Sequence, residues 1–326
     1  PVVSSINQEN HRCHMNEFPR TSIKKILIYG YGVMGEAVAR TFVKSGFEVS
    51  VFSSRADELS DSEKNLTFHK KLPSEVPDLV IEFVPEDIVD KQKVYQQIES
   101  SYGGEPLIAT GTSGLDLIVL ANGLKYPERF LGVHYFMPAE STAVVEVMAG
   151  PNCKPEDVDD VSNAMKCSGK ETVVLYQPVV GFLINRLQHI ILHECYYLIE
   201  NGVAGPGDID MSARMMLGPR MCINGLIKQK DISGLKIHAD AQRSIVPNLH
   251  SIDTPNPMIQ NMVKRGECGL GDGKGFYDWS DIDIKNIRSQ SGIRLSRLTE
   301  FLRGESEKES GVLEPRSRSR KELLKE

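Results

Sequence analysis

A histidine and a glutamate stand inside one apolar stretch of the sequence, GVHYFMPAESTAVVEV, residues 132–147. His134 is followed twelve residues later by Glu146, whose neighbours Val145 and Val147 are apolar. Polar side chains in apolar surroundings must find a partner or serve a function. A carboxylate beside a histidine fixes its tautomer and stabilises its charged form, which makes an acid–base pair. The stretch alone leaves two alternatives open: a catalytic pair, or two structural residues that are satisfied separately.

A glycine-rich turn near the start of the folded region indicates a nucleotide site. The motif GYGVMG has the spacing G-x-G-x-x-G, follows an apolar strand and opens a helix, which is the context that this dinucleotide-binding fingerprint requires. Its first glycine permits a tight turn, its second lets the backbone approach a pyrophosphate, and its third allows close packing of helix on sheet. The alternative is a turn that binds nothing. The predicted cofactor residues of the turn and of a later strand end are Gly30, Tyr31, Gly32, Val33, Met34, Gly35, Val84 and Pro85.

The end of the second predicted strand bears on the choice of cofactor. NAD sites usually carry Asp or Glu there, about 20 residues after the glycines, to hold the ribose 2′-hydroxyl. This chain has Ser53, Ser54 and Arg55 instead. Two hydroxyls and a guanidinium can bind a 2′-phosphate, which a carboxylate would repel. The sequence therefore favours NADP(H) over NAD(H), with a solvated Arg55 as the alternative interpretation.

With a dinucleotide site in the same chain, the histidine and the glutamate acquire a specific interpretation. An enzyme that interconverts alcohols and ketones needs a group that exchanges the hydroxyl proton while a hydride moves. Histidine suits this role because its side chain titrates near neutral pH. We therefore interpret His134 as the acid and base of such a reaction and Glu146 as its orienting partner.

The elements that must position these residues alternate between strands and helices. Apolar runs predict strands at 24–30, 47–54, 66–70, 77–84 and 106–114, and helices at 31–46 and 87–102. Such alternation predicts an α/β fold, a doubly wound and mainly parallel Rossmann sheet with helices on both faces. After about residue 177 the sequence is helical and poor in strands, so an all-helical domain is expected to follow. Its first helix, 182–200, is apolar nearly all round and is predicted to be buried.

The chain divides into four parts on this basis. We predict a polar tail over 1–21, a dinucleotide-binding Rossmann domain over 22–177, a helical substrate and dimerisation domain over 178–285, and a charged, partly disordered tail over 286–326. Pro178 and Gly181 mark the boundary between the two folded domains.

Composition argues against several classes of partner. The net charge of −6 gives no reason to expect nucleic acid or an anionic membrane. No apolar run approaches the roughly 18 residues that a transmembrane helix needs. The six cysteines show neither C-x-x-C nor zinc spacing, as expected for reduced thiols in a cytoplasmic protein. His189 and His193 stand four apart on one helix, but no third ligand is evident, so no metal site is predicted.

The chain resembles the L-3-hydroxyacyl-CoA dehydrogenase family over about residues 24–280. The matching pieces, in order, are GYGVMG, DLVIEFVPED, TGTSGL, GVHYFMPA, VVEV, GFLINRL and GDGKGFYDW. The resemblance implies that His134 is the catalytic histidine and Glu146 its partner. It further implies that Ser113 hydrogen-bonds the reacting substrate oxygen and that Asn185 helps to position the substrate. Family members commonly pair through the helical domain, so a homodimer is expected.

Three departures from the family concern cofactor and substrate. Ser53 replaces the expected aspartate, and Met137, which we assign to the substrate site, replaces the asparagine of H-x-F-N-P. The roughly 25 residues from Ser53 to Asp78 leave no room for the helical hairpin that clamps CoA in acyl-CoA members. The expected reaction is hydride transfer between NADP(H) and a 3-hydroxyacyl thioester or a small 3-hydroxy or 3-keto acid. An imine or ketone reductase of the same fold and a nucleotide-binding subunit without catalysis are the alternatives.

Overall fold

The computed structural model describes residues 20–59, 66–309 and 315–324 of the 326-residue chain. Residue contacts divide the chain into two compact units that meet between Leu187 and Gln188. The polar tail expected at the start of the chain lies almost wholly outside the described residues. The domain boundary at residues 177 and 178 stays a prediction, and the contacts place the division ten residues further along the chain.

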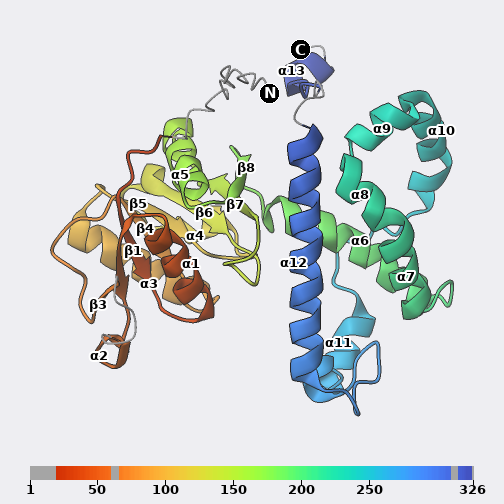
Figure 1. The fold of residues 1–326 in the computed structure, drawn as a ribbon, viewed down its shortest axis with the longest axis horizontal. Coiled ribbons are helices and arrows are strands. Elements are labelled where there is room, and N and C mark those ends of the chain that lie inside the picture. The colour runs from red at the N-terminus through yellow and green to blue at the C-terminus, as the bar shows by residue number, and fades with distance from the viewer. Residues whose placement is uncertain (1–19, 60–65, 310–314, 325–326) are drawn as a thin grey trace, which may run out of the picture. The chain divides into compact units, whose positions relative to one another are not determined.

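The first unit is built on one sheet with the strand order β3-β2-β1-β4-β5-β6-β7-β8 (Figure 1). Neighbouring strands are parallel except β6 and β7, which are antiparallel. The central strands read as continuous apolar runs because both faces of the sheet are covered. The strands are β1 (Lys25–Tyr29), β2 (Glu48–Phe52), β3 (Thr67–His69), β4 (Leu79–Glu82), β5 (Leu107–Thr110), β6 (Phe130–His134), β7 (Val144–Ala149) and β8 (Glu171–Leu175).

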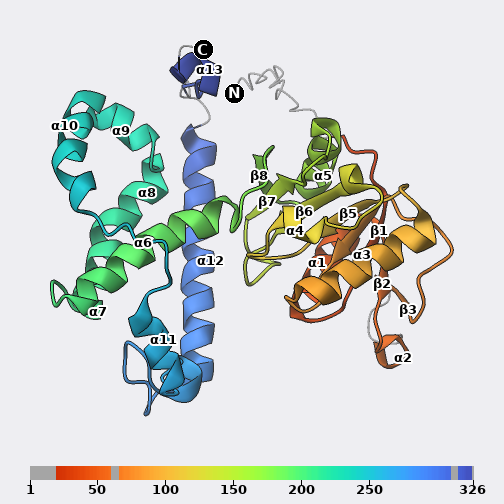
Figure 2. The ribbon, with the colours of Figure 1, turned by 180° about the vertical axis from the view of Figure 1, so that it is seen from behind.

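Helices form a layer on each face of this sheet. The helix α1 (Val33–Lys44) is nearest the viewer in Figure 1, and α3 (Ile88–Tyr102) in the reverse view of Figure 2. Apolar side chains of α1 and α5 (Pro155–Cys167) share one buried cluster, and those of α3 and α4 (Leu117–Leu120) share another. Short helices at α2 (Ala56–Leu59) and η1 (Pro127–Arg129) complete the unit. The predicted doubly wound, mainly parallel Rossmann sheet is confirmed.

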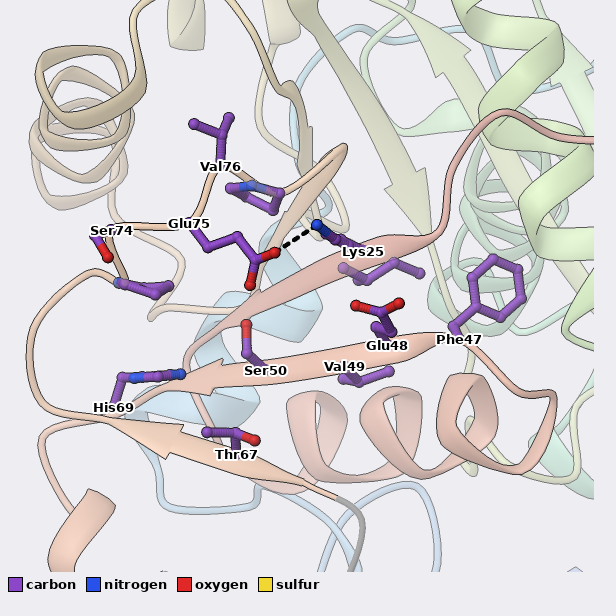
Figure 3. A pocket seen from close by; sticks show the side chains of 13 residues that line it. Lys25, Phe47, Glu48, Val49, Ser50, Thr67, His69, Ser74, Glu75 and Val76 are labelled. Atoms are coloured by element: carbon purple, nitrogen blue, oxygen red, sulfur yellow. Dashed lines mark hydrogen bonds and ion pairs between the residues drawn. The ribbon is translucent and has the colours of Figure 1, made fainter.

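One pocket of this unit lies on the face of the sheet opposite α1. Its volume is about 610 Å³, and Glu48, Ser50, Thr67 and His69 line it from β2 and β3 (Figure 3). Lys25, at the start of β1, forms an ion pair there with Glu75. Ligands of open α/β sheets bind outside the carboxyl ends of the strands. Because β1 and β2 contribute their amino-terminal halves, the pocket lies apart from the edge where a dinucleotide is expected.

The second unit is helical over its described residues, which confirms the predicted architecture. It begins within α6 and contains no strand beyond isolated bridges in the part that the structure describes. None of its described helices combines the length and the apolar character needed to cross a bilayer. Its elements are α6 (Phe182–Glu200), α7 (Pro206–Ser212), the π-helix η2 (Ala213–Leu217), α8 (Gly218–Asn224), α9 (Lys228–Ser233), α10 (Leu235–Ile245), η3 (Val246–Asn248), α11 (Pro257–Lys264), η4 (Leu270–Asp272), α12 (Ile284–Glu309) and α13 (Arg320–Leu324).

Two expectations about this half of the chain differ from the structure. The helix α6 spans the predicted residues, but Phe182 is its only buried side chain and Ile190 is 62% exposed. The prediction of a buried helix was wrong for a single chain. Apolar residues lie all round α6, and the rest of the chain does not cover most of them. Much of the expected charged tail forms α12, in which Leu295, Leu298 and Leu302 recur at helical spacing.

Candidate active site

The glycine turn connects β1 to α1 and is shaped for close approach. Gly30 has φ of 102°, and a Cβ there would lie 2.8 Å from the carbonyl oxygen of Phe83. A Cβ on Gly35 would lie 2.0 Å from the carbonyl oxygen of Gly30, so the helix packs directly on the turn. A Cβ on Gly32 would meet no atom within 4 Å. The turn therefore presents open backbone at the amino end of α1, as a pyrophosphate requires.

The other residues predicted for the cofactor surround this turn. Tyr31 is buried, Val33 is 70% exposed, and Met34 packs against the apolar cluster under α1. Val84 and Pro85 follow β4, whose carboxyl end is adjacent to that of β1 in the sheet. Val84 is half-buried and Pro85 is exposed. The structure thus brings the two predicted groups to the same edge of the sheet.

The end of β2 lies beside the same turn. The Nη2 atom of Arg55 donates a hydrogen bond of 2.7 Å to the carbonyl oxygen of Tyr31. Ser53 is buried, and its hydroxyl accepts a hydrogen bond of 3.2 Å from the Arg55 amide, whereas Ser54 is exposed. The guanidinium is therefore held at the edge of the glycine turn.

His134 and Glu146 form a buried pair. They occupy paired positions of the antiparallel strands β6 and β7, which explains the twelve residues between them. Nδ1 of His134 lies 2.7 Å from Oε2 of Glu146. His134 is 4% exposed and Glu146 is fully buried. Because Nδ1 faces the carboxylate, Nε2 is the ring nitrogen left for a substrate.

The second carboxylate oxygen of Glu146 is held by the start of α6. Oε1 accepts hydrogen bonds of 2.8 Å from the Leu183 amide and 2.9 Å from the Ile184 amide. These are first-turn amides without partners inside their own helix, and a helix amino terminus favours negative charge. Both oxygens of Glu146 are therefore fixed, one toward α6 and the other toward His134.

Ser113 and Asn185 are joined to each other. The side-chain amide of Asn185, on α6, donates a hydrogen bond of 2.8 Å to the carbonyl oxygen of Ser113. Ser113 is exposed and follows β5, the neighbour of β6 in the sheet. Met137 follows β6 and is 59% exposed. The four residues predicted to be catalytic thus belong to the first unit, two as the His–Glu pair and two through this contact, and so does Met137.

The sequence analysis missed a charged group that supports Ser113. Oε1 of Glu86 accepts hydrogen bonds from the Thr112 hydroxyl at 2.5 Å, the Ser113 amide at 2.9 Å and the Gly114 amide at 3.3 Å. Burial raises the pKa of Glu86, but these hydrogen bonds and the charge of Lys91 outweigh it and hold the pKa below its ordinary value. Glu86 is therefore ionised at neutral pH and fixes the turn that carries Ser113.

Behind Glu86 lies a fully buried ion pair, which was also missed. Nζ of Lys91 lies 2.8 Å and 3.0 Å from the two oxygens of Glu82, and 3.4 Å from Oε2 of Glu86. Tyr95 donates to Glu82 at 2.7 Å, and burial raises its pKa far above the ordinary value, so it stays a donor. The sequence does indicate Glu82, because this residue interrupts the apolar run LVIEFV in the way that His134 interrupts the apolar run around it.

The chemistry that this arrangement can support follows from its side chains and the glycine turn. The described residues contain no group of three or more His, Cys, Asp or Glu side chains placed to hold a metal ion. What the geometry offers is a histidine fixed by a carboxylate, an exposed serine on the next strand end and a glycine turn on the same sheet edge. Such a set can exchange a proton with a hydroxyl or carbonyl oxygen beside a bound dinucleotide.

Two sequence profiles match the chain. The profile of the 3-hydroxyacyl-CoA dehydrogenase NAD binding domain matches residues 70–178, and that of the C-terminal domain of the same enzymes matches residues 181–279. Together they cover more than half of the chain. The first match begins after the glycine turn.

Individual relatives cover more. The 5-formyl-3-hydroxy-2-methylpyridine 4-carboxylate 5-dehydrogenase of Mesorhizobium japonicum is 26% identical over 306 residues, which are 86% of this chain and 99% of that protein. A probable 3-hydroxybutyryl-CoA dehydrogenase of Bacillus subtilis is 27% identical over 290 residues, 79% of this chain and 98% of that protein.

Solved structures show the same similarity. A crystal structure of the 5-formyl-3-hydroxy-2-methylpyridine 4-carboxylic acid 5-dehydrogenase, described as NAD+ dependent, has a TM-score of 0.79 at 26% identity and covers 86% of this chain and 99% of its own. The 3-hydroxyacyl-CoA dehydrogenase of Archaeoglobus fulgidus has a TM-score of 0.63 at 26% identity, with 87% of this chain and 99% of its own covered.

Proposed function

Because the chain belongs to the 3-hydroxyacyl-CoA dehydrogenase family, we propose that it transfers a hydride between NADP(H) and a small 3-hydroxy or 3-keto acid, free or as an acyl thioester. The observation that carries this proposal is the buried contact of 2.7 Å between His134 and Glu146. It lies in the same unit as the glycine turn. His134 ends β6, which is parallel to β5, so the histidine lies at the edge of the sheet where the carboxyl ends of the parallel strands meet.

The proton of the reaction passes through His134. In the direction of oxidation, Nε2 removes the proton of the substrate hydroxyl, and Glu146 stabilises the imidazolium through Nδ1. In the direction of reduction, the same nitrogen returns the proton to the carbonyl oxygen. The Ser113 hydroxyl holds that oxygen, and Asn185 fixes the backbone of Ser113. A bound nicotinamide supplies or accepts the hydride.

Residues of the glycine turn and of β2 would hold the cofactor. The backbone of Gly30, Gly32 and Gly35 fits the pyrophosphate, as the crowding at Gly30 and Gly35 and the open space at Gly32 indicate. Arg55 would bind a ribose 2′-phosphate, together with the hydroxyls of Ser53 and Ser54. Its contact with the Tyr31 carbonyl keeps the guanidinium at this position.

A free small acid suits the chain better than an acyl-CoA. The described part of the segment between β2 and β4 holds only α2 and β3, with no helical hairpin there. The relative from Mesorhizobium japonicum, which is named for a pyridine carboxylate, aligns over nearly its whole length. Met137, exposed at 59%, places an apolar thioether near the base and favours a weakly polar group on the substrate.

A substrate panel tests the proposed function. We expect turnover of small 3-hydroxy or 3-keto acids, aromatic ones included, with kcat/KM at least about tenfold above that for acetoacetyl-CoA, because no helical hairpin is present to hold the CoA chain; tenfold corresponds to about 1.4 kcal/mol. The kcat/KM of each substrate is measured from the initial rate at which the absorbance of NADPH or NADH changes. Turnover of cyclic imines but of no ketone would instead support the imine reductase, and cofactor binding without any turnover would support the inactive subunit.

The cofactor preference rests on Arg55 and gives a second prediction. Replacement of Arg55 by alanine is expected to raise KM for NADPH by about 10- to 100-fold and to leave KM for NADH nearly unchanged, because a charge-assisted contact to the 2′-phosphate is lost. Lys44→Ala removes an exposed positive charge from the far end of α1 and serves as the matched control. A native enzyme that favours NADH tenfold or more contradicts the assignment.

The second unit supports the expected homodimer. Asn256 is the one buried residue among its described residues, while Ile227, Ile237 and Met215 are 79%, 72% and 69% exposed. A set of helices without buried apolar side chains lacks the main stabilising contribution to folding. A second copy of the chain would cover this surface, in accordance with the exposed apolar side chains of α6.

A further inference from the structure

The residue before the amide groups that hold Glu146 has an unusual backbone. Phe182 has φ of 52°, and it is the only non-glycine residue with positive φ in the part of the chain that the structure describes. For a bulky side chain this conformation is a genuine outlier and is energetically unfavourable. It persists only where the surrounding structure fixes it.

The phenyl ring of Phe182 is held by the side chains packed around it. The side chain is fully buried among the apolar residues of β6, α3 and α4. A Cβ on Gly132 would lie 2.9 Å from Cζ of the ring, so the ring lies directly over β6 where that strand lacks a side chain. Two residues further along β6, the ring of His134 has its centroid 4.9 Å from that of Phe182. The ring therefore packs along the strand and against the base itself.

The backbone of Phe182 leads directly into the two amides of α6 that bind Glu146. Leu183 and Ile184 follow it directly, and their amides are the two that bind Oε1 of Glu146 at 2.8 Å and 2.9 Å. Held there, the carboxylate presents Oε2 to Nδ1 of His134. One residue thus contacts the imidazole with its ring and directs the helix end that orients the imidazole's partner.

We propose that Phe182 is a positioning residue of the His134–Glu146 pair, and that its left-handed backbone is retained because it aims the first amides of α6 at Glu146. This inference rests on the proposed function of the pair. Phe136 also contacts His134, at 4.3 Å between ring centroids, but it lies outside α6. Phe182 combines a ring contact with the imidazole and a place directly before the two amides that hold Glu146.

Two substitutions at this position separate positioning from stability. Phe182→Ala and Phe182→Gly both remove the ring, but glycine adopts positive φ without strain. We expect the glycine variant to melt at a higher temperature than the alanine variant, while both lower kcat by about 10- to 100-fold, as expected when a catalytic group is misplaced by about 1 Å. KM for NADPH is expected to change less than about twofold, because the glycine turn is untouched. Recovery of kcat in Phe182→Gly would show that the left-handed backbone orients the pair without the ring, and would overturn the positioning role of the Phe182 side chain.

A combination with Glu146 tests the route of the effect. If Phe182 acts through the carboxylate, Phe182→Ala should lower kcat little further in a Glu146→Gln background, because the two changes remove the same interaction. Multiplicative losses would contradict the proposal. Phe42→Ala is the matched control, since it removes a fully buried ring from the opposite apolar cluster and is expected to lower stability with kcat retained.

A spectroscopic measurement keeps this inference distinct from the proposed reaction. The proton on Nδ1 of His134, hydrogen-bonded to Glu146, is expected to give a downfield proton resonance in the native protein that is lost in His134→Gln. The resonance should weaken or disappear in Phe182→Gly even if no substrate on the panel is turned over. A resonance unchanged in both Phe182 variants would overturn the positioning role, whereas absence of turnover in the native protein would overturn the reaction.

Discussion

Replacement of His134 by glutamine is expected to lower kcat/KM by about 10²- to 10⁴-fold, the usual contribution of a positioned acid–base group. Glutamine keeps a polar side chain of similar length, so the buried site is not left hollow, but it cannot accept the hydroxyl proton. The affinity for NADPH, measured by titration of its fluorescence, should stay within about twofold, because no residue of the glycine turn changes.

The matched control for this substitution is His238→Gln. His238 lies on α10 in the second unit and is half-buried, with a hydrogen bond of 3.3 Å to Gln242. The substitution removes an imidazole and leaves the His134–Glu146 pair unchanged. Native turnover in His134→Gln would exclude His134 as the acid and base, and an equal loss in both variants would point to a general effect of purification or folding.

Replacement of Lys91 by methionine is expected to give the largest loss of stability. Lys91 and Glu82 are 1% and 0% exposed, so the substitution leaves a carboxylate buried without its charge partner. Breaking a buried pair from one side typically costs about 3–5 kcal/mol. For a chain of this size, that corresponds to a fall in melting temperature of about 10 °C.

Two further variants make this prediction specific. The double variant Glu82→Gln, Lys91→Met removes both charges and should recover part of the lost stability, because no unpaired charge remains. Lys93→Met lies on the same helix and removes an exposed ion pair to Asp90 of 3.1 Å, which contributes at most about 1 kcal/mol. Thermal and urea unfolding measure all three. A Lys91→Met protein as stable as Lys93→Met would contradict the assigned burial of the pair.

The sequence predicts the central part of the fold because local patterns determine it. The apolar runs of β1 and β4 and the helical spacing of α1 and α3 are visible in single segments, and the glycine turn between β1 and α1 has its own motif. The resemblance assigns His134 and Glu146, and the structure adds why twelve residues separate them. The reversal of direction at β7 pairs the two positions, and a pattern of alternating elements does not reveal such a reversal.

What the sequence does not predict depends on contacts between distant segments. Glu82 is conspicuous in an apolar strand, but its partner Lys91 comes from the next helix and is found only once α3 packs on β4. Glu86 reads as an ordinary loop residue until the turn after β5 folds over it. The burial of α6 was wrongly predicted because the spacing of apolar residues indicates only that a surface is apolar. It does not indicate whether the same chain or another chain packs against that surface.

The position of the unit boundary inside α6 has a consequence for recombination between relatives. The helix supplies Leu183 and Ile184 to Glu146 and Asn185 to Ser113 before the contacts divide at Leu187. A crossover at residue 177 would therefore exchange part of the proposed active site along with the helical domain. A gene fusion that keeps the whole proposed site and changes only the helical domain needs its junction within α6, after Leu187. A junction chosen in a loop between secondary-structure elements would miss this position.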